Sequence, residues 1–338
     1  MYARVRPLLF RLDAEQAHAW TLRLVEAAGW LGVGRRWLRM AAGGPFPPSP
    51  IEVFGLTFPN RLGLAAGYDK DGRALRGLAC LGFGHLEMGT ATPLPQSGQP
   101  RPRLFRLTQD AALINRMGFP NAGLEAVRAR LARFRPRDAI LGVNIGKGRE
   151  TPLEAAAHDY ESLQRALSPF ADYLAVNISS PNTPGLRTLQ GRAYLEGLLG
   201  RLSRARGGAA QPRPILVKLA PDLTRSEMVE AVEVIEAAGM DGVIAGNTTL
   251  SREGLASPLA VEAGGLSGSP LFRQALAMVE QISRRTQGRL PIIGVGGILG
   301  GADARAMVDA GASLVQVYTG LVYRGPRLVG EILKALGS

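Results

Sequence analysis

The sequence predicts an α/β fold in which eight strands, each followed by a helical segment, close into a barrel behind a small N-terminal helical extension. Short apolar runs alternate with helical stretches from about residue 60 to the end of the chain. These runs end, one after another, in polar or glycine-rich turns, and the first 44 residues differ in composition from the rest. Eight such units fit a (β/α)8 TIM barrel, and an open doubly wound sheet is the alternative.

Length and composition indicate a folded globular protein, since 46% of the 338 residues are hydrophobic. The net charge of +12 comes from scattered basic residues without the interleaved aromatics of a single-strand binder, so we expect no nucleic-acid partner. Cys80 is the only cysteine, which excludes a disulfide framework and a thiolate metal cluster. No apolar run reaches the roughly 18 residues of a membrane span, and we expect no signal peptide in "MYARVRPLLF".

The N-terminal extension is predicted to form two helices. Asp13 is placed to cap the first, with Gln16 three residues later, and apolar residues then recur at helical spacing. "GRRWLRM" predicts a shorter second helix, and the Pro- and Gly-rich "AAGGPFPPSP" predicts a linker. We therefore divide the chain into an extension, residues 1–44, and a barrel, residues 45–338. The extension is either a helical pair packed on the barrel or a basic amphipathic element that lies on a membrane surface.

The strand predictions begin after a short hairpin at Ile51–Asn60. The eight apolar runs that we assign to the barrel are Leu62–Ala66, His85–Gly89, Ile140–Asn144, Tyr173–Asn177, Ile215–Leu219, Gly242–Gly246, Ile292–Val295 and Leu314–Tyr318. In such barrels the catalytic groups lie at the C-terminal ends of the strands.

The strand ends carry side chains suited to a planar, anionic ligand. Lys70 and Lys218 follow the first and fifth strands, and amide side chains follow the third, fourth and sixth strands at Asn144, Asn177 and Asn247. An isoalloxazine ring needs such hydrogen-bond partners, and a nearby cation stabilises its reduced anion. The segment Ile114–Asn121 lies in a long insertion after the second strand, and we expect it to cover the mouth as part of a second ligand site.

The last two strands end in turns that favour a phosphate. Backbone N–H groups freed by glycine can point at an anion, which fits Gly296, Gly297, Thr319 and Gly320. "GVGG" is not the dinucleotide fingerprint, so it gives no support to nicotinamide binding. His18, His85 and His158 are dispersed, and we expect neither a metal site nor a Ser-His-Asp triad.

Eight stretches, in one order from about Leu56 to Arg327, closely resemble the dihydroorotate dehydrogenases. They are "GLAAGYDKDG", "INRMGF", "VNISSPNTPGLR", "VKLAPDL", "NTTL", "GGLSG", "PIIGVGGI" and "GASLVQVYTG". The extension and Ser180 resemble the membrane-associated, quinone-dependent class. The soluble class usually has Cys at this position and lacks the helical extension.

The resemblance implies an FMN enzyme that oxidises dihydroorotate to orotate in the pyrimidine (UMP) pathway and passes electrons to a membrane quinone. It implies peripheral association with the cytoplasmic side of the cell membrane. Ser180 would be the catalytic base, with Thr183 and Phe119 near it. The positions that match the family's substrate contacts are Lys70, Asn115, Arg116, Met117, Gly118, Phe119, Asn177, Asn182, Asn247 and Thr248. Those that match its flavin contacts are Ala66, Gly67, Tyr68, Asp69, Lys70, Thr90, Asn144, Asn177, Lys218, Gly246, Gly268, Gly297, Tyr318 and Thr319.

Two residues depart from the family pattern. Gly246 stands where the family usually has Thr, so one flavin contact is expected through backbone only, and Pro120 replaces a usual Asn. Three alternatives remain at this point. They are a soluble-class enzyme, another flavin barrel that acts on a different cyclic amide, and a non-catalytic phosphate or nucleic-acid binder.

Overall fold

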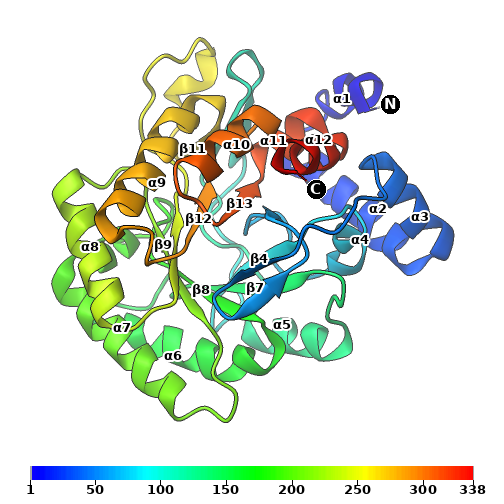
Figure 1. Ribbon diagram of the computed structural model, residues 1–338. Helices are drawn as coiled ribbons and strands as arrows, with labels where there is room; N and C mark the ends of the chain where they lie inside the picture. The colour runs from blue at the N-terminus through cyan, green and yellow to red at the C-terminus, as the bar shows by residue number, and fades with distance from the viewer. Residues whose placement is uncertain (1, 338) are drawn as a thin grey trace.

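A closed barrel of eight parallel strands forms the body of the computed structural model, which describes residues 2–337 (Figure 1). The strands follow one another around the barrel in chain order, and this confirms the predicted fold and excludes the open sheet. They are β3 (Leu62–Leu64), β4 (His85–Ala91), β7 (Ile140–Ile145), β8 (Tyr173–Asn177), β9 (Ile215–Leu219), β10 (Gly242–Ala245), β12 (Ile292–Val295) and β13 (Leu314–Val317).

Helices surround the barrel and pack their apolar faces against the outside of the strands (Figure 1). Thr224 caps the N-terminus of one of them, α8, and forms a reciprocal capping box with Glu227. The helices of the barrel are α4 (Leu75–Ala79), α5 (Gly123–Arg133), α6 (Ala156–Leu167), α7 (Arg192–Gly207), α8 (Arg225–Ala237), α9 (Phe272–Thr286), α10 (Gly301–Asp309), α11 (Thr319–Arg324) and α12 (Arg327–Leu336).

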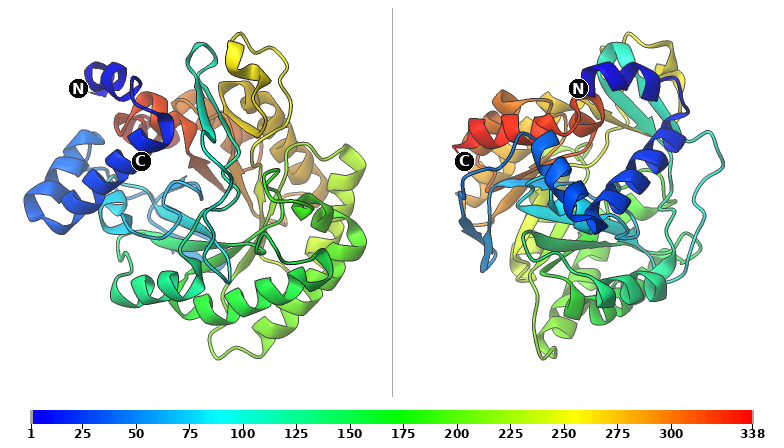
Figure 2. Two further views of the ribbon diagram at one scale, coloured as in Figure 1. Left: turned by 180° about the vertical axis from the view of Figure 1, so that it is seen from behind. Right: turned by 90° about the vertical axis from the view of Figure 1, so that its right-hand side faces the viewer.

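The N-terminal extension forms three helices, α1 (Tyr2–Leu9), α2 (Ala14–Trp30) and α3 (Gly32–Ala41). Asp13 caps α2 as predicted, since its carboxylate accepts the backbone N–H groups of Glu15 and Gln16 at 3.0 Å. The sequence analysis did not predict α1. In the right-hand view of Figure 2 the three helices lie along one side of the barrel, near the C-terminal helices.

Close backbone packing holds the extension against the barrel. A Cβ atom on Gly29 of α2 would lie 2.5 Å from the backbone nitrogen of Gly77 in α4, so only glycine allows this approach. Tyr2 adds a hydrogen bond of 2.5 Å to the backbone oxygen of Val322. Within residues 2–337, no helix combines the length and the apolar character needed to cross a membrane.

Two small sheets cover the ends of the barrel. The predicted hairpin is confirmed as β1 (Ile51–Val53) paired with β2 (Leu56–Phe58). The insertion after β4 forms β5 (Leu104–Leu107) and β6 (Ala112–Asn115), which pair with β11 (Gly265–Gly268) as an antiparallel sheet. Because β6 ends at Asn115, this sheet places the start of the predicted substrate segment beside the barrel mouth.

Several predicted strand ends differ from the observed ones at the mouth. The first strand ends at Leu64 and not at Ala66, although the Ala65 N–H still donates to the Val317 oxygen at 3.1 Å and the Gly67 N–H to the Gly89 oxygen at 2.8 Å. In contrast, β4 continues to Ala91, where it pairs with Ile145 of β7. Backbone hydrogen bonds therefore tie residues 65 and 67 to the two neighbouring strands, and residues 65–67 lie at the mouth of the barrel.

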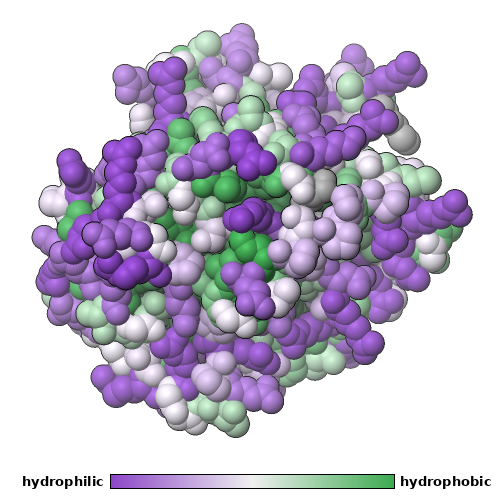
Figure 3. Space-filling model, viewed as in Figure 1, coloured by the Kyte–Doolittle hydropathy of each residue, from purple (hydrophilic) through white to green (hydrophobic). Residues whose placement is uncertain are grey.

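Exposed apolar side chains concentrate on the extension. Figure 3 shows one face of the molecule, on which hydrophilic side chains dominate and apolar ones gather near the centre. Over residues 2–337, the large apolar side chains of the extension that stay exposed are Val5, Leu8, Leu12, Trp20, Leu24, Trp30, Leu31, Val33, Trp37 and Met40. Few others on the described surface share this exposure, so the extension is the most apolar part of the outside.

Candidate functional site

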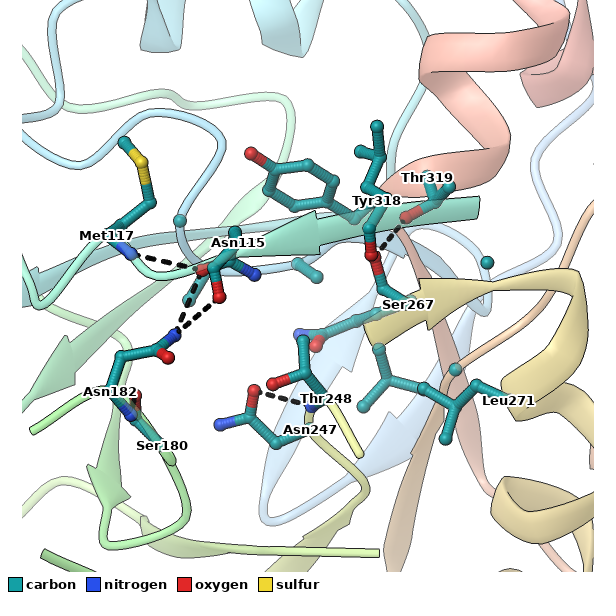
Figure 4. Close-up of a pocket in the computed structure, with 18 of the residues that line it drawn as sticks. Asn115, Met117, Ser180, Asn182, Asn247, Thr248, Ser267, Leu271, Tyr318 and Thr319 are labelled. Carbon is teal, nitrogen blue, oxygen red and sulfur yellow. Dashed lines mark hydrogen bonds between the residues drawn. The ribbon is translucent and has the colours of Figure 1, made fainter. Parts of the chain in front are cut away.

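A cavity opens at the C-terminal ends of the barrel strands, where the sequence analysis placed the site. Ten of its side chains are labelled in Figure 4, and they come from several strand ends and from the covering sheet. The predicted site residues that line it are Ala66, Gly67, Lys70, Thr90, Asn115, Met117, Gly118, Phe119, Asn177, Ser180, Asn182, Lys218, Asn247, Thr248, Gly268, Gly297, Tyr318 and Thr319.

Five predicted site residues do not line this cavity: Tyr68, Asp69, Arg116, Asn144 and Gly246. The Asp69 carboxylate instead accepts the backbone N–H groups of Arg73 and Ala74 at the start of α4. The Arg116 guanidinium forms an ion pair with Glu262 at 2.6 Å. These two side chains are therefore engaged in building the walls of the site.

Asn144 lies one layer below the cavity and orients two residues that line it. Its Oδ1 accepts from Thr90 Oγ1 at 2.6 Å and from Asn177 Nδ2 at 3.1 Å. Asn177 Oδ1 in turn accepts from Ser179 Oγ at 3.1 Å, and that hydroxyl accepts from Asn247 Nδ2 at 2.8 Å. This buried chain of hydrogen bonds fixes the amides at the ends of β8 and β10 relative to one another.

The loop after β8 brings Ser180 to the cavity. Asn182 anchors this loop, since its Nδ2 donates to the backbone oxygen and to Oδ1 of Asn115, at 3.0 and 3.1 Å (Figure 4). Ser180 Oγ accepts the backbone N–H of Asn182 at 3.3 Å, and the side chain is 6% exposed. In the described chain Thr183 Oγ1 is buried without a protein hydrogen-bond partner. The loop therefore holds a serine hydroxyl and a second, unengaged hydroxyl near the cavity.

The glycines after β12 form the opposite wall. Gly296 and Gly297 have φ values of +132° and +73°, which side chains rarely adopt. A Cβ atom on Gly297 would also lie 2.5 Å from the backbone of Phe272. Beside them the hydroxyls of Ser267 and Thr319 lie 2.8 Å apart (Figure 4). Backbone N–H groups, two hydroxyls and no side-chain bulk at the glycines make a wall that suits a phosphate.

Lys70 and His18 carry perturbed pKa values. Burial lowers the pKa of Lys70 to about 8, and its Nζ donates to the backbone oxygen of Gly67 at 2.8 Å. Burial, followed by the positive charge of Lys70, lowers the pKa of His18 to about 4, so its imidazole is neutral at physiological pH. The His18 ring packs edge-on against Tyr68, with centroids 4.9 Å apart.

Several residues of the cavity wall were not predicted: Glu15, His18, Leu104, Leu113, Ser267, Leu271 and Gln316. His18 looked isolated in the sequence because the nearest predicted site residue, Ala66, is far along the chain. Only the packing of α2 against the barrel brings the two together. Leu104 and Leu113 belong to β5 and β6, so their position depends on where the insertion folds.

A second, apolar cavity lies between the extension and the barrel. Its wall includes Leu9, Phe10 and Val25 from α1, the α1–α2 turn and α2, together with Arg106 and Val322 from the barrel. It shares His18, Leu104, Leu113 and Tyr318 with the cavity at the mouth. The two cavities are therefore separated by no more than these side chains.

The comparisons with known proteins agree with this architecture. The family model described as dihydroorotate dehydrogenase matches residues 50–338. A "Dihydroorotate dehydrogenase (quinone)" of Alkalilimnicola ehrlichii is 50% identical over 343 aligned residues, which cover 99% of each chain. A relative of the same name from Salinispora arenicola is 53% identical, and the alignment covers 96% of this chain and 95% of the relative.

Solved structures show the same likeness. The structure of DHODH from Eimeria tenella in complex with ferulenol has a TM-score of 0.84 and 37% sequence identity, and it covers 96% of this chain and 90% of that chain. The ligand-free form has a TM-score of 0.82 and 39% identity, with 89% and 92% covered. The match extends through the N-terminal helices as well as the barrel, and the chain belongs to the dihydroorotate dehydrogenase family.

Proposed function

We propose that this protein is a quinone-dependent dihydroorotate dehydrogenase that oxidises (S)-dihydroorotate to orotate in pyrimidine biosynthesis. The observation that carries the proposal is the contact between the two cavities. A polar cavity with a buried serine and several amides meets an apolar cavity under the extension, with His18, Leu104, Leu113 and Tyr318 between them. One cavity suits a polar ring substrate above a cofactor, and the other suits an apolar electron acceptor.

The donor set of the mouth fits FMN. The Gly296–Gly297 turn and the hydroxyls of Ser267 and Thr319 would hold its phosphate, while Lys218 and Asn177 would bind the ring. When bound, FMN would supply an acceptor for the substrate hydride and a donor of electrons to the quinone. The predicted flavin positions that do not line the cavity, including Asp69 and Gly246, would act through the walls that they build.

Ser180 would take the proton from C5 of the substrate through its Oγ. A serine hydroxyl is a weak base at neutral pH, so the proton needs an onward path. Thr183 Oγ1 lies on the same loop and is buried without a protein partner in the described chain. Lys70 would bind the substrate carboxylate, and Asn115, Asn182, Asn247 and Thr248 would bind the ring amides. The loop anchored by Asn182 would keep water away from these groups.

The extension would bring the quinone from the membrane. Its exposed tryptophans and aliphatic side chains lie among arginines, which suits a surface that carries anionic headgroups. The apolar cavity beneath α1 and α2 would admit the quinone from that side. We therefore propose peripheral attachment to the cytoplasmic side of the cell membrane, with residues 1–44 as the attaching element.

An anaerobic absorbance titration tests the proposal. The purified protein should show a flavin spectrum that bleaches on addition of dihydroorotate and recovers on addition of a soluble ubiquinone analogue. Fumarate and NAD⁺ serve as controls for the soluble class and should not restore the spectrum. Flavin that fails to bleach would contradict the substrate, and a colourless protein that FMN cannot reconstitute would contradict the cofactor.

A further inference from the structure

A carboxylate lies inside the barrel, one layer below the cavity. Glu87 of β4 is fully buried, and both of its oxygens are engaged. Asn144 Nδ2 donates to Oε1 at 2.9 Å, while Gln316 Nε2 and the Tyr173 hydroxyl donate to Oε2 at 2.9 and 3.2 Å. The Lys218 ammonium lies 3.7 Å from Oε1. Glu87 itself does not line the cavity, whereas Lys218 and Gln316 do.

This position is costly for a charge. The interior of such a barrel is usually filled with branched apolar side chains. A buried carboxylate loses its hydration, and a good ion pair and hydrogen bonds only approximately offset that loss. An apolar residue would fill the space without that cost. The presence of Glu87 therefore calls for a role beyond packing.

The neighbours of Glu87 are oriented by its charge. Gln316 turns its amide nitrogen toward Glu87 and leaves its own Oε1 buried without a partner in the described chain. Burial, and next the charge of Glu87, raise the pKa of Tyr173 well above its usual value, so its hydroxyl stays a donor. Every group around the carboxylate is thus held as a donor, because an ionised carboxylate can only accept.

The same constraint reaches the cavity wall through Asn144. Since its Nδ2 is used by Glu87, its Oδ1 must face Thr90 and Asn177. A neutral amide at position 87 could present a donor to Asn144 and would remove this constraint. Lys218 is held in a similar way, by an opposite charge on the side away from the cavity.

We propose that Glu87 is a positioning residue for the flavin, one that orients Lys218 and Asn144 from below and offsets the positive charge of Lys218. This inference rests on the assignment of FMN to the mouth. With Glu87 ionised, the flavin meets a nearly neutral pair of side chains. With the carboxylate removed, it meets an unbalanced ammonium, which stabilises the anionic reduced flavin.

The test is the flavin reduction potential of the full-length protein with FMN bound, measured against a reference dye. In Glu87→Gln, the equilibrium should shift at least tenfold toward reduced flavin, which is about 30 mV for a two-electron couple. Tyr173→Phe is the matched control, because it removes a donor to the same carboxylate and leaves the charge in place. Its potential should shift by less than half as much.

Melting temperature separates this role from a purely structural one. A Glu87→Gln variant that melts lower but keeps the parental potential would overturn the inference. If Glu87→Gln does not fold, Glu87→Asp takes its place, because it moves the carboxylate away from Lys218 by about one methylene. The flavin reduction potential of Glu87→Asp should then rise measurably, but by less than the tenfold shift in equilibrium expected for Glu87→Gln. An unchanged potential there would also overturn it. A parent protein without FMN would contradict the proposed function itself, whereas a flavin-loaded parent beside an unshifted variant would contradict only this inference.

Discussion

The N-terminal extension and the barrel interior depart from the usual distribution of residues in opposite directions. On the extension, Trp20 is 60% exposed and Val33 is 77% exposed, although large apolar side chains are normally covered. Inside the barrel, Glu87, Lys218 and Asn144 are buried where apolar residues are the rule. Each region is costly for an isolated soluble protein.

The difference shows what each region is built to meet. Exposed apolar surface is costly only while it faces water, so burial of the extension in the proposed membrane surface would lower the free energy. Buried polar groups are most costly where they lack partners, so binding of the proposed polar ring and phosphate at the barrel mouth would lower the free energy. The two cavities share wall residues where these regions touch, among them His18 and Tyr318.

The largest effect in the barrel is expected when the proposed catalytic base is removed. Ser180→Ala should lower turnover of dihydroorotate by roughly 10²- to 10⁴-fold, since that is the usual contribution of general base catalysis. FMN content should remain that of the parent, because Ser180 Oγ accepts only the Asn182 N–H among the described residues. The measurement is steady-state turnover with a soluble quinone, normalised to bound flavin.

Ser162→Ala is the control for that variant. Ser162 lies on the outer helix α6, its hydroxyl donates to the backbone oxygen of Asp159, and it does not line the cavity. It should leave turnover and flavin content unchanged. Near-parental turnover in Ser180→Ala would show that another group takes the proton.

Membrane binding by the extension is tested by removing exposed apolar side chains that line neither cavity. Trp20 and Val33 are exposed and line neither cavity. Trp20→Ser combined with Val33→Ser should weaken partition onto phosphatidylcholine–phosphatidylglycerol vesicles by about 100-fold, because burial of two such side chains contributes roughly 3 kcal/mol. Turnover with a soluble quinone should not change. Cosedimentation with vesicles measures the partition.

Val261→Ser is the matched control, since Val261 is 89% exposed and lies outside the extension. It should leave vesicle binding unchanged. If the double variant bound vesicles as tightly as the parent, the membrane surface would have to lie elsewhere. Membrane binding would then not explain the exposed apolar side chains of the extension.

These two regions also differ in how far the sequence predicted them. Strand ends could be read one by one, because the barrel brings the C-terminal ends of its strands together whatever the loops do. Lys70, Asn177 and Lys218 were found in this way, and all three line the cavity. The quoted stretches that resemble the family added Ser180 and Asn182.

What the sequence left out depends on contacts between distant segments. His18 and Glu15 reach the cavity only because α2 packs on the barrel, with Gly29 against Gly77. Glu87 was not predicted as a site residue for another reason. It lies within a predicted strand, and strand alternation alone says which face a residue takes but not which charges surround it there. A charged residue inside an apolar run was the available signal.

The smallest expected effect concerns Glu15, which joins the two regions. Its carboxylate on α2 forms ion pairs with Arg101 and with the buried Arg103, at 3.0 and 2.7 Å. Arg103 also donates to the backbone oxygens of Ser97 and Gln99 in the loop before β5. Burial works against the ionised form of Glu15, but the hydrogen bonds from the two arginines together outweigh it and lower the pKa of Glu15 below 4.5.

A group whose pKa is lower in the folded protein stabilises the fold above its unfolded pKa, and the contribution disappears as pH falls through the folded value. Glu15→Gln should therefore lower the free energy of unfolding by about 1–3 kcal/mol at pH 7, and the difference from the parent should shrink as the pH is lowered below 4.5. Urea unfolding at a series of pH values measures it. Glu125→Gln, which breaks an exposed pair with Arg128, should change stability by less than about 0.5 kcal/mol. Equal stability of parent and Glu15→Gln at pH 7 would mean that the other contacts, including the Gly29–Gly77 approach and the Tyr2 hydrogen bond, hold the extension on the barrel without these ion pairs.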